Sequence, residues 1–191
     1  ELTRRGYTVS AFDLDPSMID RAVTKAGSLP VDFRVLDMLA LDPEYPEDHF
    51  DGVTCFGNTL VHLPGTEAIA SFFRSVYRVL KPGGKFLFQI LNYDLIGAKR
   101  ITSLPLIENK TIRFVREYEH LPGGSLLFRT RLFIKAEAVE LMQNIELYPL
   151  RKGELSSLLE GAGFSSCSFS RSFEREGFSS ESLPLIGSVV K

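Results

Sequence analysis

The stretch from Tyr7 to Met18 constrains the fold most, because it changes from strand chemistry to helix chemistry within a few residues. Tyr7 to Phe12 is an apolar, β-branched and aromatic run without proline or glycine, which predicts a buried strand that stops at Asp13. Asp15 then suits the N-cap of a helix and Pro16 its first position. A strand followed at once by a helix is typical of a parallel sheet covered by helices.

The rest of the chain continues this alternation except for one segment. Further strands are expected at residues 31–36, 50–56, 85–91, 164–173 and 185–190, and helices at residues 66–80, with Thr66 as cap, and 155–162. Residues 111–134 instead alternate polar and apolar side chains around a Pro-Gly-Gly turn, and Gln143 to Tyr148 adds a third such strand. We therefore predict an α/β fold whose mostly parallel sheet comprises residues 1–91 and 150–191, with residues 92–149 as an inserted antiparallel sheet.

Composition excludes several classes of partner. The 191 residues carry a net charge of -2, so no general attraction to a polyanion is expected and nucleic acid is an unfavourable main partner. No apolar run approaches the roughly 18 residues of a membrane span, and no membrane partner is expected. The two cysteines, Cys55 and Cys167, have no metal-ligand spacing; we expect no metal and a reducing, cytoplasmic compartment.

Two predicted strands in a row end at a carboxylate, Asp13 in the first and Asp37 in the second. In open α/β folds, an acidic side chain at this end of a strand accepts hydrogen bonds from the ribose hydroxyls of an adenosine cofactor. The alternative is that Asp13 is an ordinary strand-end residue and that Asp37 caps a turn.

Five segments, in order, resemble the class I S-adenosylmethionine-dependent methyltransferases, in particular the small-molecule branch with an antiparallel insertion after the fifth strand. The resemblance covers nearly the whole chain outside the insertion and implies a Rossmann-like sheet that is mostly parallel and ends in an antiparallel strand pair. The segments are Val9-Ser-Ala-Phe-Asp-Leu-Asp-Pro-Ser-Met18, Arg34-Val-Leu-Asp-Met38, Phe50-Asp-Gly-Val53, Val79-Leu-Lys-Pro-Gly-Gly84 and Leu158-Leu-Glu-Gly-Ala-Gly-Phe164.

The resemblance implies S-adenosylmethionine as cofactor and a role for each matching residue. Asp13 would bind the ribose hydroxyls, with Leu14 against the adenine ring. Asp37 would receive the adenine amino group, and the backbone N–H of Met38 would reach the ring. The cofactor residues implied by the resemblance are Asp13, Leu14, Asp37, Met38, Phe56 and Gly57, the last two bordering the methionine part.

One departure from the family concerns the glycine-rich loop that precedes the ribose-binding acid. In related dinucleotide folds the glycine fingerprint lies roughly 20 residues ahead of that acid, and counting back this far from Asp13 passes the start of the sequence. We therefore expect a sheet that lacks its first strand, as in a fragment of a longer protein; the alternative is a complete chain that is catalytically inactive. The strands around Val9 and Val53 should then not pair with each other.

The expected reaction is methyl transfer to a small-molecule acceptor by in-line displacement, in which the protein mainly supplies alignment. His62 is the candidate general base, although a lone histidine is commonly structural. The candidate acceptor pocket comprises Asn58, Tyr93, Arg116 and Tyr118, and the insertion would act as a lid or as the contact of a homodimer. Two alternatives remain: a nicotinamide-dependent oxidoreductase, and a non-catalytic cofactor sensor or scaffold subunit.

Overall fold

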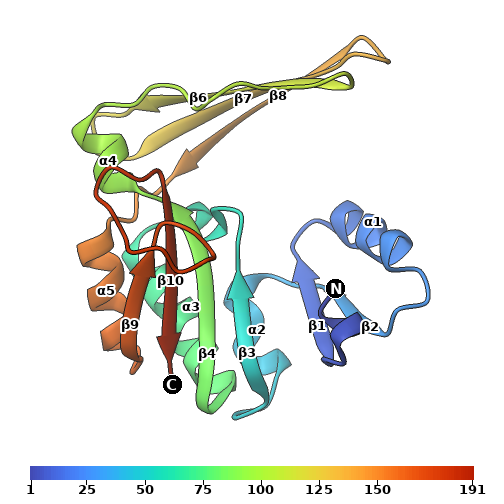
Figure 1. Ribbon diagram of the computed structural model, residues 1–191, viewed down its shortest axis with the longest axis vertical. Helices are drawn as coiled ribbons and strands as arrows, with labels where there is room; N and C mark the ends of the chain where they lie inside the picture. Colours follow the sequence, from blue (N-terminus) through green and yellow to red (C-terminus); the bar gives the residue numbers. More distant parts are fainter.

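The computed structural model describes residues 1–191 and contains three separate sheets (Figure 1). The first is the parallel pair β1 (Val9–Asp13) and β2 (Val31–Val35). The second has the order β3-β4-β10-β9, formed by β3 (Phe50–Cys55), β4 (Leu80–Leu91), β10 (Pro184–Val190) and β9 (Ser165–Ser170). The third has the order β5-β6-β7-β8, formed by β5 (Ile107–Glu108), β6 (Ile112–His120), β7 (Leu126–Ile134) and β8 (Val139–Leu147).

Eight helical segments connect these strands. They are η1 (Thr3–Arg5), α1 (Pro16–Ala26), η2 (Met38–Ala40), α2 (Leu41–Glu44), η3 (Thr59–His62), α3 (Thr66–Val79), α4 (Tyr93–Ala98) and α5 (Lys152–Gly161). As predicted, Asp15 caps α1 by accepting a hydrogen bond from the Ser17 backbone N–H at 2.8 Å. The prediction of Thr66 as a cap is wrong, because Gly65 occupies the cap position and Thr66 is already helical. None of the helices has the length and apolar character that a membrane crossing requires.

The core lies between α3 and the second sheet. Phe72 and Phe73 of α3 meet Phe86 of β4 with ring centroids about 6 Å apart, at 6.1 and 6.0 Å respectively. These rings are at most 2% exposed, as expected from the helical spacing of apolar residues in α3. β3 runs parallel to β4, whereas β10 runs antiparallel to both β4 and β9. The sheet therefore has the predicted parallel part and antiparallel terminal pair.

The inserted sheet lies over the carboxyl ends of β3 and β4 (Figure 1). Its outer strand β8 begins at Val139 rather than at Gln143, so it is longer than predicted. The Tyr148 backbone N–H, just after β8, donates to the Val61 carbonyl at 2.9 Å and ties this sheet to η3. The carboxyl ends of β3 and β4 therefore lie on the side of the second sheet that faces the inserted sheet (Figure 1).

β1 and β3 belong to different sheets and do not pair, as expected from the sequence. β1 lies on the side of its own sheet that is nearer to β3 (Figure 1). Among residues 1–40 only Ile19 is buried, whereas β4 contains five residues below 9% exposure. The segment containing β1 and β2 thus contributes little to the common core.

This difference predicts a gradient of local stability. Amides of β1 should exchange with solvent hydrogen faster than those of β4 between Phe86 and Ile90, because β4 is paired on both edges and packed under α3. Hydrogen-exchange mass spectrometry of the whole protein measures this directly. Equal protection of the two strands would show that β1 belongs to the same cooperative unit as β4.

Candidate functional site

Asp13 and Asp37 follow two neighbouring parallel strands and lie at the same edge of the first sheet. Asp13 is paired in register with Val35, two residues before Asp37. One oxygen of each carboxylate is used locally, since Asp13 Oδ1 accepts from the Asp15 N–H and Asp37 Oδ1 from the Leu39 N–H, both at 2.9 Å. Asp37 therefore does cap a turn, as the alternative interpretation held. Its second oxygen and that of Asp13 form no hydrogen bond, and both side chains are exposed.

Apolar surface accompanies these acceptors. Leu14 is 67% exposed directly after Asp13, and Phe56 is 43% exposed at the end of β3. Met38, beside Asp37, is half-buried against the core. Exposed apolar side chains beside free acceptors fit a ligand that combines a flat apolar ring with polar edges.

The turn after β3 is fixed by hydrogen bonds to β4. Gly57 and Asn58 both have positive φ, at 79° and 68°. The Gly57 N–H donates to Gln89 Oε1 at 3.0 Å, the Asn58 N–H donates to the Gln89 carbonyl at 3.1 Å, and Asn58 Oδ1 accepts from the Leu91 N–H at 3.0 Å. Sequence reasoning missed Gln89, although a lone polar residue inside the apolar run of this strand was a usable signal.

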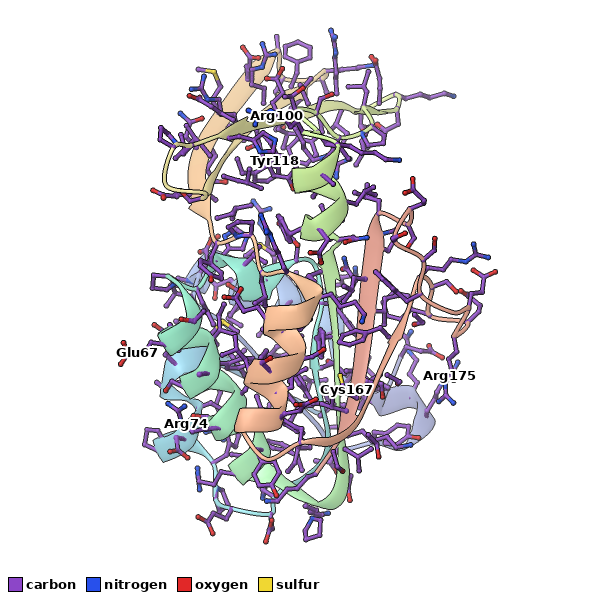
Figure 2. The ribbon with its side chains drawn as sticks, turned by 90° about the vertical axis from the view of Figure 1, so that its left-hand side faces the viewer. Glu67, Arg74, Arg100, Tyr118, Cys167 and Arg175 are labelled. Carbon is purple, nitrogen blue, oxygen red and sulfur yellow. The ribbon has the colours of Figure 1, made fainter.

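Asn58 also connects the sheet containing β3 and β4 to Tyr93 of α4, which lies beside Tyr118 of β6. Its Nδ2 donates to the Tyr93 hydroxyl at 2.8 Å. Burial raises the pKa of Tyr93 and that of Tyr118, which are 1% and 4% exposed. The Tyr118 hydroxyl lies beside that of Tyr93 but makes no hydrogen bond of normal geometry. Figure 2 shows Tyr118 in the inserted sheet, close to α4.

The sequence of this chain is similar to those of known proteins. Residues 1–84 match the family model described as "Methyltransferase domain". The ubiquinone biosynthesis O-methyltransferase of Pseudomonas entomophila is 30% identical over 128 residues, which are 62% of this chain and 53% of that protein. The chain thus spans about half the length of the curated relatives it matches.

Solved structures agree over nearly the whole chain. The CcbJ methyltransferase from Streptomyces caelestis superposes with a TM-score of 0.80 at 22% identity, covering 98% of this chain and 76% of that one. An S-adenosylmethionine-dependent methyltransferase from Clostridium acetobutylicum gives 0.79 at 17% identity, covering 96% and 75%. The chain has the fold of these methyltransferases. In this methyltransferase fold, Asp13, Asp37 and the turn after β3 gather at one end of the sheets.

Two further predicted residues, Arg116 and His62, form no hydrogen bond with Asn58, Tyr93 or Tyr118. Arg116 projects along the inserted sheet, where its Nη2 donates to the Pro105 carbonyl at 2.8 Å and its guanidinium lies 5.6 Å from the centre of the Phe114 ring. It therefore holds the loop after α4 and does not contact Asn58. His62 ends η3 and forms no hydrogen bond, and partial burial lowers its pKa, which favours the neutral imidazole.

One aromatic residue at the site was not predicted. Phe173, in the polar loop between β9 and β10, packs edge-on against Phe56 with ring centroids 5.3 Å apart. Nothing in the loop sequence indicates this contact, because it depends on how the loop folds back over the sheet.

Cys55 is buried at the end of β3, and burial raises the pKa of its thiol to about 12. No group of three or more His, Cys, Asp and Glu side chains is arranged to hold a metal ion.

Proposed function

We propose that this protein transfers a methyl group from S-adenosylmethionine to a small-molecule acceptor by in-line displacement. The methyltransferase fold, the match of residues 1–84 to the methyltransferase domain and the ubiquinone O-methyltransferase relatives support the reaction. The observation that carries it is the pair Asp13 and Asp37, each with a free carboxylate oxygen, at the ends of adjacent parallel strands. No specific observation favours the oxidoreductase or the non-catalytic alternative.

The side chains at these strand ends fit such a cofactor. Asp13 would accept from the ribose hydroxyls and Asp37 from the adenine amino group, because each keeps one unpaired oxygen. Leu14 would cover the adenine ring, and Phe56 and Gly57 would border the methionine part. When bound, S-adenosylmethionine supplies a methyl group already activated by its positive sulfur. The protein's own contribution is then to orient the acceptor and exclude water.

A competition experiment tests the cofactor class. Bound S-adenosylmethionine should be displaced from the whole protein by S-adenosylhomocysteine and not by NAD, because S-adenosylhomocysteine keeps the adenosine and amino-acid parts of the cofactor whereas NAD carries a second nucleotide instead of the amino acid. Isothermal calorimetry with each competitor gives the answer. Displacement by NAD alone would instead support the oxidoreductase.

We propose that Asn58, Tyr93 and Tyr118 form one wall of the acceptor pocket, with the inserted sheet as its lid. Their hydroxyl and amide groups cluster between the turn after β3 and β6. Arg116 would act from the lid by holding the loop at Pro105. Amine, hydroxyl, carboxylate and carbon acceptors are all compatible with this wall. A homodimer through the insertion remains a sequence-based prediction.

Tyr118→Phe should lower kcat/KM for the acceptor by roughly 2- to 10-fold, because it removes one neutral hydrogen-bonding group and keeps the ring that packs on Phe128. The affinity for S-adenosylhomocysteine should stay unchanged. Steady-state kinetics with an acceptor found by mass-spectrometric screening measure both effects. Tyr77→Phe, which alters a tyrosine of α3 outside this cluster, is the matched control. Equal kinetics of Tyr118→Phe and the wild type would remove Tyr118 from the acceptor wall.

We propose His62 as the general base for acceptors that lose a proton. Because its pKa is lowered below the ordinary value of 6.5, the neutral form persists to lower pH than for a free histidine. The plot of kcat/KM against pH should therefore rise through an apparent pKa below 6.5 and reach a plateau above it. His62→Gln should abolish this acid limb. If the rise of kcat/KM at low pH persists in His62→Gln, a group other than His62 is responsible for it.

A further inference from the structure

A cavity lies on the α5 side of the molecule, on the opposite side from β1 and β2 (Figure 1). It has a volume of about 200 Å³ and lies between α4, the turn joining β6 to β7 and the segment before α5. A more open hollow of about 500 Å³ adjoins it at Gly124, Ser125 and Arg151. None of the proposed cofactor residues lines either space.

Two arginine side chains line this cavity without a charged partner. Arg100 follows α4 and Arg151 precedes α5, and neither guanidinium takes part in any ion pair or hydrogen bond of the structure. The Arg151 Nη2 lies over α4, 3.8 Å from the position that a Cβ on Gly97 would occupy. His120 also lines the cavity, with its Nε2 3.0 Å from the Ile101 carbonyl. The cavity thus contains two guanidinium groups that have no hydrogen-bond or ion-pair partner within the protein.

The backbone adds to this character. Arg151 is the N-cap residue of α5 and gives no side-chain cap, so the first turn of a ten-residue helix, with Gly153, opens toward the hollow. The two nearby carboxylates are already hydrogen-bonded: Asp94 accepts from the Lys152 N–H at 2.9 Å, and Glu154 from the Tyr148 hydroxyl at 2.6 Å. Neither approaches the arginines closely enough to form an ion pair.

Arg100 also occupies an unfavourable backbone conformation. Its φ of 46° lies in the left-handed region, where glycine or asparagine is favoured after a helix. A long cationic side chain at this position is therefore not explained by the turn itself. The Arg100 side chain instead forms part of the wall of the cavity.

We propose that this cavity binds a small anion, a carboxylate or phosphate group, held by Arg100, Arg151 and the first turn of α5. Planar guanidinium groups bind both anions through paired hydrogen bonds. Tyr93, which belongs to the proposed acceptor wall and bonds to Asn58, also lines the cavity, so the anion would lie beside that wall. The site does not depend on methyl transfer. It would take either a free anion or the anionic end of an acceptor.

Titration of the ¹⁵N-labelled whole protein with inorganic phosphate tests the proposal, with sodium chloride titrated to equal ionic strength for comparison. Phosphate, and acetate as the carboxylate probe, should shift the amide signals of Gly124 and Gly153 while those of Gly27 and Gly65 stay fixed. Arg151→Gln should weaken the affinity about tenfold or more, as expected for the loss of a charge-assisted hydrogen bond. Arg74→Gln, on an exposed and unpaired arginine of α3 (Figure 2), should leave it unchanged.

The substitution Arg100→Gly distinguishes an effect on phosphate binding from an effect on protein stability. It removes the left-handed strain and should raise the melting temperature, yet it should weaken phosphate binding about as much as Arg151→Gln. Repeating the titration with saturating S-adenosylhomocysteine and a screened acceptor distinguishes the two sources, since competition by the acceptor identifies its own anionic end. Signal changes that are equal in chloride and phosphate, or that survive both arginine substitutions, would overturn the proposal.

Discussion

Gly187→Ala is expected to destabilise the protein by about 2–3 kcal/mol, the upper part of the range for overpacking a core. Gly187 is buried in β10 and pairs with Phe88 of β4, and a Cβ built on it would lie 2.0 Å from the Phe88 Cζ. The Phe88 ring is 0% exposed and contacts Phe86 with centroids 5.2 Å apart, so it has no free space to move into. Thermal denaturation should show a melting temperature lower by roughly 5–10 °C.

Gly123→Ala provides the control, because a Cβ on Gly123 meets no atom within 4 Å and its φ is not positive. This change should shift stability by less than about 0.5 kcal/mol, as is usual for surface positions. In a Phe88→Ala background, Gly187→Ala should cost much less, since the clashing ring is absent. A similar melting temperature for Gly187→Ala and Gly123→Ala would show that β10 moves away from β4 at little cost.

The main elements could be predicted because their causes are local. The strand ending at Asp13, the cap at Asp15 and the apolar face of α3 each follow from residues close together in sequence, and all three are confirmed. The prediction that this strand is buried is wrong, because no residue of β1 is buried and Tyr7 is 62% exposed. Helix α4 was not predicted, since six residues are too few to show a helical period. Asn92 caps it by accepting a hydrogen bond from the Leu95 N–H at 3.2 Å, a signal that was present but was not used.

The candidate site was predictable only in part. Asp13 and Asp37 could be placed together because the carboxyl ends of adjacent parallel strands share an edge. The contact of Phe173 with Phe56 and the approach of Tyr118 to Tyr93 join segments far apart in the sequence. Such contacts depend on how the loops and the insertion pack, and no periodicity or spacing encodes them. The alternating pattern places Arg116 and Tyr118 on the same face of the inserted sheet. The side chain of Arg116 is long, however, and its guanidinium donates to the Pro105 carbonyl.

Asp13→Asn is expected to weaken binding of S-adenosylhomocysteine by about 1.5–3 kcal/mol, or roughly 10- to 150-fold, the range for hydrogen bonds to a charged group. Asparagine keeps one carbonyl oxygen for the Asp15 N–H, so the local turn is preserved. The second position becomes an amide donor, which cannot accept from a ribose hydroxyl. This change therefore isolates the proposed cofactor contact from the structural one.

Calorimetric titration of S-adenosylhomocysteine into the wild-type protein, Asp13→Asn and the control Asp20→Asn tests the central claim most directly. Asp20 is an exposed carboxylate on α1, away from the strand end, and its side chain makes no hydrogen bond. The proposed site predicts a dissociation constant raised roughly 10-fold or more by Asp13→Asn and left within about twofold by Asp20→Asn. Equal affinity of all three proteins would contradict the assignment of Asp13 as the ribose-binding carboxylate.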